Sequence, residues 1–115
     1  MNKSEILDMS AGREIDALTW LMLHDKPLDL FTCRHVDGDI QPHSGYPSGH
    51  ISPPNYSTDI SDAWTVLLNF KEVYIEYKDE EYFVMIGDDF DASSENKSAP
   101  LAICLAALLA VMDFE

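Results

Sequence analysis

Residues 98–112 read Ser-Ala-Pro-Leu-Ala-Ile-Cys-Leu-Ala-Ala-Leu-Leu-Ala-Val-Met, and this stretch decides the fold of the chain. Ser98 is a good N-cap for a helix, because its hydroxyl accepts a hydrogen bond from a first-turn amide. Pro100 suits the first turn, where no amide donor is needed. The residues after Pro100 are apolar on every side, which is typical of a buried helix. The stretch is shorter than the roughly 20 residues that span a bilayer, so we predict a core helix over 99–112.

The charge of the chain limits its partners. We predict one domain over 1–115, with residues 1–10 as a flexible extension or a short helical turn. The 7 Lys and Arg against 21 Asp and Glu give a formal net charge of -14. Such a chain repels phosphates, so direct binding to nucleic acid or an anionic membrane is disfavoured. It attracts a basic protein surface instead. The alternative is that the acids only keep the protein soluble.

The two cysteines and the amino-terminal residues indicate the cellular compartment in which the protein is expected. Cys104 lies within the apolar helix and Cys33 in a predicted strand, and free cysteine is often buried as a small hydrophobe. We therefore expect no disulfide. Residues 1–8 contain no apolar core and no small-residue cleavage site of a secretory signal. A cytoplasmic location is expected.

Two further helices are predicted upstream of the core helix. The first covers 11–23, is capped by Ser10, and has apolar residues at helical spacing. The second covers 58–70 and is capped by one of Ser57, Thr58 and Asp59. Its buried stripe is expected to comprise Ile60, Ala63, Trp64, Leu67 and Leu68.

The strands predict the fold class. A strand is expected within 28–36, with Phe31 and Cys33 on one face, followed by a turn at 37–38. The β-branched and aromatic segments 73–77 and 82–86 predict a β-hairpin. Residues 39–56, rich in Pro and Gly, and the acidic residues 87–97 are expected to be loops. The order α-β-α-β-β-α predicts an α+β domain with three helices on a small, mostly antiparallel sheet.

Three segments resemble the phage ABA sandwich domain family: residues 11–18, 54–64 and 99–111. The resemblance implies a small protein encoded by a bacteriophage or prophage, with a layered α/β/α sandwich, acting in the cytoplasm of a bacterial host. It implies no established activity, so no catalytic residue is carried over. The chain departs from the family before Ala11 and in the His-, Pro- and Gly-rich region 33–53.

Zinc ligation is the first chemistry to consider. Cys33, His35, His43 and His50 are of zinc-ligand type, but only the first two are close in sequence, and structural zinc sites draw their ligands from close pairs. We therefore interpret them as loop histidines and an inward-facing cysteine.

The acidic run after the hairpin offers oxygen ligands for a hard cation. However, Ser94 and Pro100 stand where a calcium-binding loop requires glycine and glutamate. We therefore interpret Asp88, Asp89 and Asp91 as part of a solvated loop.

Nucleophilic catalysis has no clear signature. Ser44 follows His43, and Ser48 lies between Pro47 and Gly49, but neither reproduces the Gly-x-Ser-x-Gly elbow. No Gly-rich phosphate-binding loop precedes a helix. We expect a protein that is not an enzyme and that has no metal or cofactor.

The hairpin and the segment after it carry the favoured functional hypothesis. Between Glu72 and Glu95, Lys78 is the only basic residue among a series of acidic residues, and tyrosines are interleaved with the acids. Tyrosine is enriched at protein interfaces. The predicted partner-binding residues are Tyr74, Glu76, Tyr77, Asp79, Glu80, Glu81, Asp88, Asp89 and Asp91.

This acidic strip predicts binding to a host protein with a basic surface. The most concrete version is a DNA-mimicking inhibitor of a nucleic-acid-binding immune complex, of the anti-CRISPR kind. One alternative is a non-catalytic sponge for a nucleotide immune signal, with Tyr46 or Tyr56 stacking on a base. A purely structural phage role is another alternative, and a homodimer is compatible with all of them.

Overall fold

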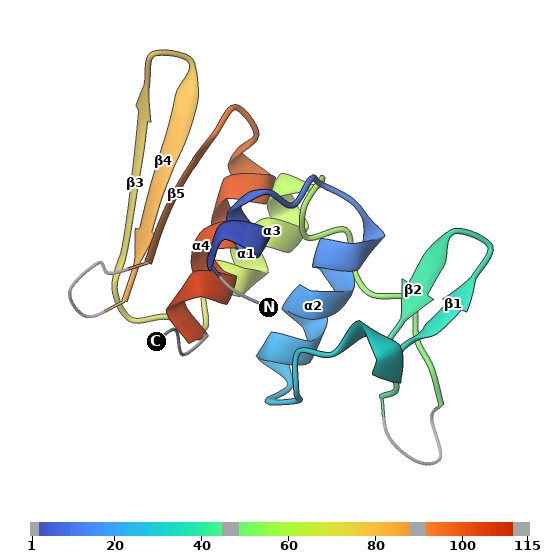
Figure 1. The fold of residues 1–115 in the computed structure, drawn as a ribbon. Helices are drawn as coiled ribbons and strands as arrows, with labels where there is room; N and C mark the ends of the chain where they lie inside the picture. Colours follow the sequence, from blue (N-terminus) through green and yellow to red (C-terminus); the bar gives the residue numbers. More distant parts are fainter. Residues whose placement is uncertain (1–2, 45–48, 88–91, 112–115) are drawn as a thin grey trace.

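The computed structural model describes residues 3–44, 49–87 and 92–111. It confirms the α+β class, with helices packed on a small antiparallel sheet. The helices within these residues are α1 (Lys3–Leu7), α2 (Arg13–Leu23), α3 (Ile60–Leu67) and α4 (Ala99–Val111). The strands are β1 (Arg34–Val36), β2 (Asp39–Gln41), β3 (Val73–Lys78), β4 (Glu81–Ile86) and β5 (Ala92–Asn96). Figure 1 shows the β3-β4-β5 sheet on one side of the helices and the β1-β2 pair on the other.

Helix α4 is the centre of the core, as the sequence predicts. The amide of Leu101 donates to the Ser98 hydroxyl, which confirms the N-cap. Every residue from 101 to 109 is buried, so α4 is the most buried of the helices. It contacts α1, α2 and α3 as well as β4 and β5. None of the described helices is both long and apolar enough to cross a membrane.

The hairpin is confirmed, and a third strand joins it. Val73 pairs with Ile86 and Lys78 with Glu81, so β3 and β4 are joined by the two residues 79–80. Strand β5 lies within 87–97, where the sequence analysis predicted only a loop. That prediction was wrong because β5 is held by tertiary contacts: it pairs antiparallel with β4, and the buried Ser94 hydroxyl donates to the Ala102 carbonyl of α4 at 2.6 Å.

The start of α2 differs from the prediction. Gly12, and not Ser10, is the N-cap, and no side chain makes a capping hydrogen bond. The Gly12 amide donates to the Ser57 hydroxyl at 3.0 Å. The segment before α3 therefore supplies the hydrogen-bond acceptor for the amide at the start of α2. This is a long-range contact that no local sequence pattern predicts.

The face of α3 is also different. Asp59 is its N-cap and accepts from the Asp62 amide. Ala63 and Leu67 are buried as predicted, together with Val66. The rest of the predicted stripe was wrong, because α3 turns its Ala63 side towards the core: the exposed fractions are 50% for Ile60, 54% for Trp64 and 75% for Leu68.

The segment before β1 is a 3-10 turn and not an extended strand. Asp29 accepts from the Phe31 amide and initiates a 3-10 helix over Leu30–Thr32. Phe31 is consequently 98% exposed, whereas Cys33 is buried, so the predicted shared face was wrong. The predicted turn at 37–38 is confirmed. It joins β1 to β2, and β2 corrects the expectation of a loop over all of 39–56.

Arg13 forms ion pairs and hydrogen bonds with several segments of the amino-terminal half of the chain. Its guanidinium donates to the carboxylates of Asp16 and Asp39, at 3.0 and 2.7 Å. It also donates to the side chains of Asn55 and Ser52 and to the carbonyl of Pro53. Asp16 is 1% exposed, and its second carboxylate oxygen accepts from the Ser57 amide. One side chain thus links α2, β2 and the segment before α3.

Candidate protein-binding surface

The three-stranded sheet has one face packed on α4 and one face that no described helix covers. Val84 and Ile86 are fully buried on the α4 side. Because side chains alternate along a strand, the residues between them point the other way. We call this second side the open face. Its residues are Tyr74, Glu76, Lys78, Glu81, Phe83, Met85, Ser93 and Glu95.

A hollow of about 320 Å³ lies on the open face near the tip of the hairpin. Glu76, Phe83 and Glu95 stand in one row across the three strands. The half-buried ring of Phe83 thus lies between two carboxylates. We call the described residues of this lining the acidic hollow: Glu76, Lys78, Asp79, Glu81, Phe83 and Glu95.

The two tyrosines of β3 lie on opposite faces. Tyr74 is on the open face, where its hydroxyl donates to a Glu76 carboxylate oxygen at 2.8 Å. This hydrogen bond and the charge of Glu76 raise the pKa of Tyr74. Tyr77 is on the α4 side and its ring lies 4.8 Å from that of Tyr82. The predicted partner-binding set is therefore divided between the two faces.

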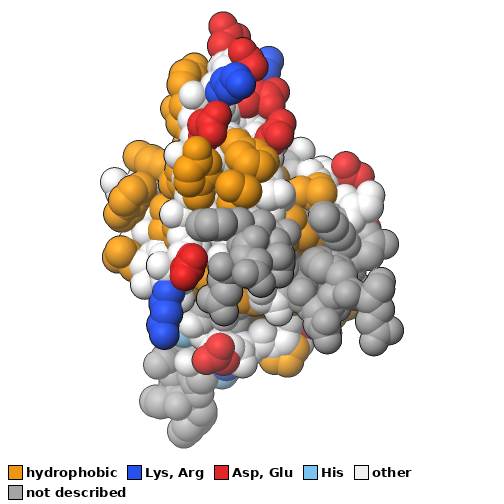
Figure 2. All heavy atoms as spheres, turned by 90° about the vertical axis from the view of Figure 1, so that its left-hand side faces the viewer, with side chains coloured by type: hydrophobic (Ala, Val, Ile, Leu, Met, Phe, Trp, Pro, Cys, Tyr) orange, Lys and Arg blue, Asp and Glu red, His pale blue; other side chains and the backbone are white. Residues whose placement is uncertain are grey.

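The tip of the hairpin carries two more of the predicted acids. Asp79 and Glu80 are both exposed, and both have positive φ, 54° and 64°. This matches a two-residue hairpin turn of the type that favours Asn-Gly. Figure 2 shows the resulting cluster of acidic and basic side chains at the top of the molecule, with hydrophobic side chains below it. Asp88, Asp89 and Asp91 lie outside the described residues.

The family model of the phage ABA sandwich domain matches residues 28–108, well over half of the chain. The chain belongs to this family. The matched span holds α3, the complete acidic hollow and most of α4. Residues 11–18, which carried part of the sequence resemblance, precede it. Neither the curated proteins nor the solved structures yield a match to the chain.

The predicted zinc-type residues of this phage ABA sandwich protein come together only in part. His43 and His50 form an isolated bridge, and their rings lie 4.8 Å apart. Desolvation and the charges of His43 and Arg34 lower the pKa of His50. Among the described residues, no three ligand-type side chains form a group that would hold a metal.

The cysteines are free thiols, both buried. Burial raises the pKa of Cys33, and it raises the pKa of Cys104 to about 12. Both thiols therefore stay protonated at neutral pH and are poor nucleophiles.

The serine and tyrosine candidates of the 39–56 region are engaged elsewhere. The Ser44 hydroxyl donates to the Gly49 carbonyl at 2.7 Å. Tyr56 is only 5% exposed, and burial raises its pKa to about 12. Tyr56 thus packs in the core, and the expectation that it stacks on a nucleotide base was wrong. Tyr46 and Ser48 lie outside the described residues.

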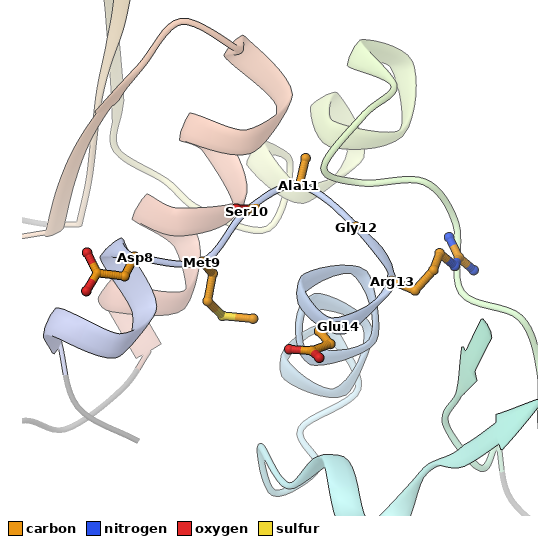
Figure 3. Close-up of a pocket in the computed structure, with 7 residues that line it drawn as sticks. All are labelled: Asp8, Met9, Ser10, Ala11, Gly12, Arg13 and Glu14. Atoms are coloured by element: carbon orange, nitrogen blue, oxygen red, sulfur yellow. The ribbon is translucent and has the colours of Figure 1, made fainter. Parts of the chain in front are cut away.

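A second hollow, of about 490 Å³, follows the connection between α1 and α2, and the described residues that line it are 8–14. Figure 3 shows Arg13 directed away from α1. Its guanidinium is bound to Asp16 and Asp39. The other charged residues that line this hollow are Asp8 and Glu14, both acidic.

Two members of the candidate surface, Phe83 and Glu95, are not predicted from the sequence. The alternation of Phe83 and Met85 with Val84 and Ile86 is the signal that places Phe83 on the open face. Glu95 had no such signal, because it depends on the pairing of β5 with β4.

Proposed function

We propose that this phage-family protein binds a basic surface of a host protein through the acidic hollow and the hairpin tip. It would do so as a binding protein, without catalysis and without a cofactor, in the cytoplasm of a bacterial host. One observation carries the proposal: among the described residues, four carboxylates and a single lysine line one hollow together with Phe83.

The chemistry of the acidic hollow suits an arginine or lysine side chain. A guanidinium ion can stack on an aromatic ring while its edge donates to carboxylates. Phe83 supplies the ring, and Glu76 and Glu95 flank it in register. The long-range field of a chain with net charge -14 would speed the encounter with a basic partner.

The most specific form of the proposal is DNA mimicry. Proteins that grip nucleic acid do so with Lys and Arg contacts to phosphates. The acidic hollow and the two acids at the tip would occupy such a surface and exclude its nucleic acid. An inhibitor of a nucleic-acid-binding immune complex, of the anti-CRISPR kind, would act in this way.

The first experiment is capture from a host lysate with the immobilised protein. A triple variant, Glu76→Gln, Glu81→Gln and Glu95→Gln, removes three charges from the hollow. The matched control, Glu14→Gln, Asp25→Asn and Asp37→Asn, removes three exposed charges elsewhere. We expect the control to retain the partner and the hollow variant to lose it. Equal capture by both variants would show that the acidic hollow is not the binding site.

Salt dependence and competition test the mimicry itself. Capture should weaken steeply between about 0.1 M and 1 M salt, because the screening length falls from about 10 Å to about 3 Å. Duplex DNA should release the captured partner, since both ligands need the same basic surface. If duplex DNA does not release the captured partner, the protein would still be a host-binding protein, but the proposal that it mimics DNA would be refuted.

A further inference from the structure

An apolar groove of about 420 Å³ lies between α3 and β3, away from the open face. We define the apolar groove by its lining: Trp64, Leu67, Leu68, Phe70, Lys71, Val73 and Ile75. Exposed fractions of 54% for Trp64, 75% for Leu68 and 38% for Ile75 show that large apolar groups here are left in water. Contiguous apolar surface of this kind marks an interaction site.

The groove adjoins an unpaired sheet edge. Among the described strands, β3 pairs with β4 alone. Its other edge therefore presents backbone donors and acceptors to an incoming strand. Strand β5, at the opposite edge of the sheet, has the polar sequence Ala-Ser-Ser-Glu-Asn. The apolar side chains thus accompany β3 and not β5.

We propose that the occupant is a second copy of this chain, with the two β3 strands paired antiparallel about a two-fold axis at Ile75. The two sheets would join into one. Each copy would bury its β3 edge and part of its apolar groove. The apolar groove and the acidic hollow share no lining residue, although both include residues of β3, so the proposal does not depend on the hollow binding a host protein.

Charge selects this register. With Ile75 opposite Ile75, Tyr74 faces Glu76 and Glu72 faces Lys78, so every charged pair within 72–78 is compatible. A shift of two positions in one direction puts Glu72 opposite Glu76. The same shift in the other direction puts Glu76 opposite itself. Like charges directly opposite each other destabilise a sheet, and shifts by one residue turn the apolar grooves to opposite faces of the joined sheet.

The same register supplies a side chain for the groove. Tyr77 of each copy would face Val73 of the other, which lines the apolar groove. Tyr77 is 62% exposed in the single chain and lies on the same side of the sheet as Val73. Tyr77 would therefore lose exposed apolar area by packing beside the partner's groove. Its large, stiff ring suits an interface.

Cysteine cross-linking tests the register directly. Ile75→Cys would place two thiols opposite each other on the axis, where paired Cα atoms lie about 4.5–5.5 Å apart, within reach of a disulfide. Tyr77→Cys is the matched control, because its two copies would lie four positions apart, about 13 Å. With a mild oxidant, Ile75→Cys should form a covalent dimer and Tyr77→Cys should not. The parent chain controls for Cys33 and Cys104, which are buried.

Charge exchange provides an independent test by sedimentation over a range of protein concentrations. The parent should dimerise, and Glu72→Lys should weaken the dimer about tenfold by facing Lys78 with a lysine. Adding Lys78→Glu should restore it. Phe31→Glu, at the 98% exposed Phe31, should have no effect.

A parent that stays monomeric throughout, or a Tyr77→Cys variant that cross-links in preference to Ile75→Cys, would overturn the proposal. A dimer unaffected by Glu72→Lys would also overturn it. Salt separates this contact from the acidic hollow: raising salt should tighten the dimer, since each copy carries a net charge of -14, whereas it should weaken capture of a basic partner.

Discussion

Replacing Arg13 by methionine should destabilise the protein more than the same replacement of any other Lys or Arg. The change removes the only described cationic partner of Asp16, which is 1% exposed. Breaking a buried ion pair costs about 3–5 kcal/mol because a carboxylate is left without compensation. The bond to Asp39, whose side chain is 23% exposed, contributes less than the bond to the buried Asp16. We therefore expect a loss of about 3 kcal/mol, which lowers Tm by about 12 °C for a domain of this size.

Thermal and urea unfolding followed by circular dichroism would measure this loss. Arg34→Met is the matched control, because Arg34 is exposed and, among the described residues, its guanidinium donates only to the Gln41 side chain. It should change the free energy of unfolding by less than about 1 kcal/mol. Adding Asp16→Asn to Arg13→Met should regain about 1 kcal/mol, since the amide carries no charge and still accepts from the Ser57 amide. If the double variant is less stable than Arg13→Met, or Arg13→Met matches Arg34→Met, the buried charge is not the cause.

Three further predictions concern the core, the pH dependence and the hairpin turn. Leu108→Ala, at a fully buried position of α4, should lower the free energy of unfolding by about 2–5 kcal/mol through cavity formation, measured by urea unfolding. The hydrogen bond from Arg13 holds the pKa of Asp39 well below its usual range, so Asp39→Asn should destabilise the protein most above about pH 4. That difference should shrink as pH falls through the folded-state pKa, in unfolding measured across acid pH. Replacing Asp79-Glu80 by Asn-Gly should raise the free energy of unfolding by about 1 kcal/mol, because both residues have positive φ.

The elements that the sequence predicts well are those whose own residues determine them. The all-apolar run of α4 and its Ser98 cap need no partner to be recognised, and the β-branched and aromatic segments of the hairpin are equally local. Strand β5 was missed because Ser93, Ser94 and Glu95 have little intrinsic preference for strands. Its conformation depends on β4 and on the hydrogen bond from Ser94 to α4.

The candidate surface was predicted in its charge but not in its geometry. The acids of the hairpin are evident in the sequence, whereas the acidic hollow depends on Glu95 and Phe83 meeting across β4 and β5. Helix α3 shows the converse limit. Its apolar residues cover a wide arc, and periodicity alone does not say which part of that arc faces α4. The sequence pattern thus predicts that Trp64 and Leu68 are core residues, although they line an exposed groove.

The position of α4 has a consequence for biosynthesis. The element that every other described helix and the larger sheet pack against is the last of the described elements to leave the ribosome. At usual elongation rates the 25 residues from 87 to the end of α4 at residue 111 take roughly 1–5 s to make. During that interval the inner side of the hairpin, with Val84 and Ile86, has no helix to cover it. The nascent chain would therefore be a substrate for holding chaperones, and folding would complete in one step when α4 emerges.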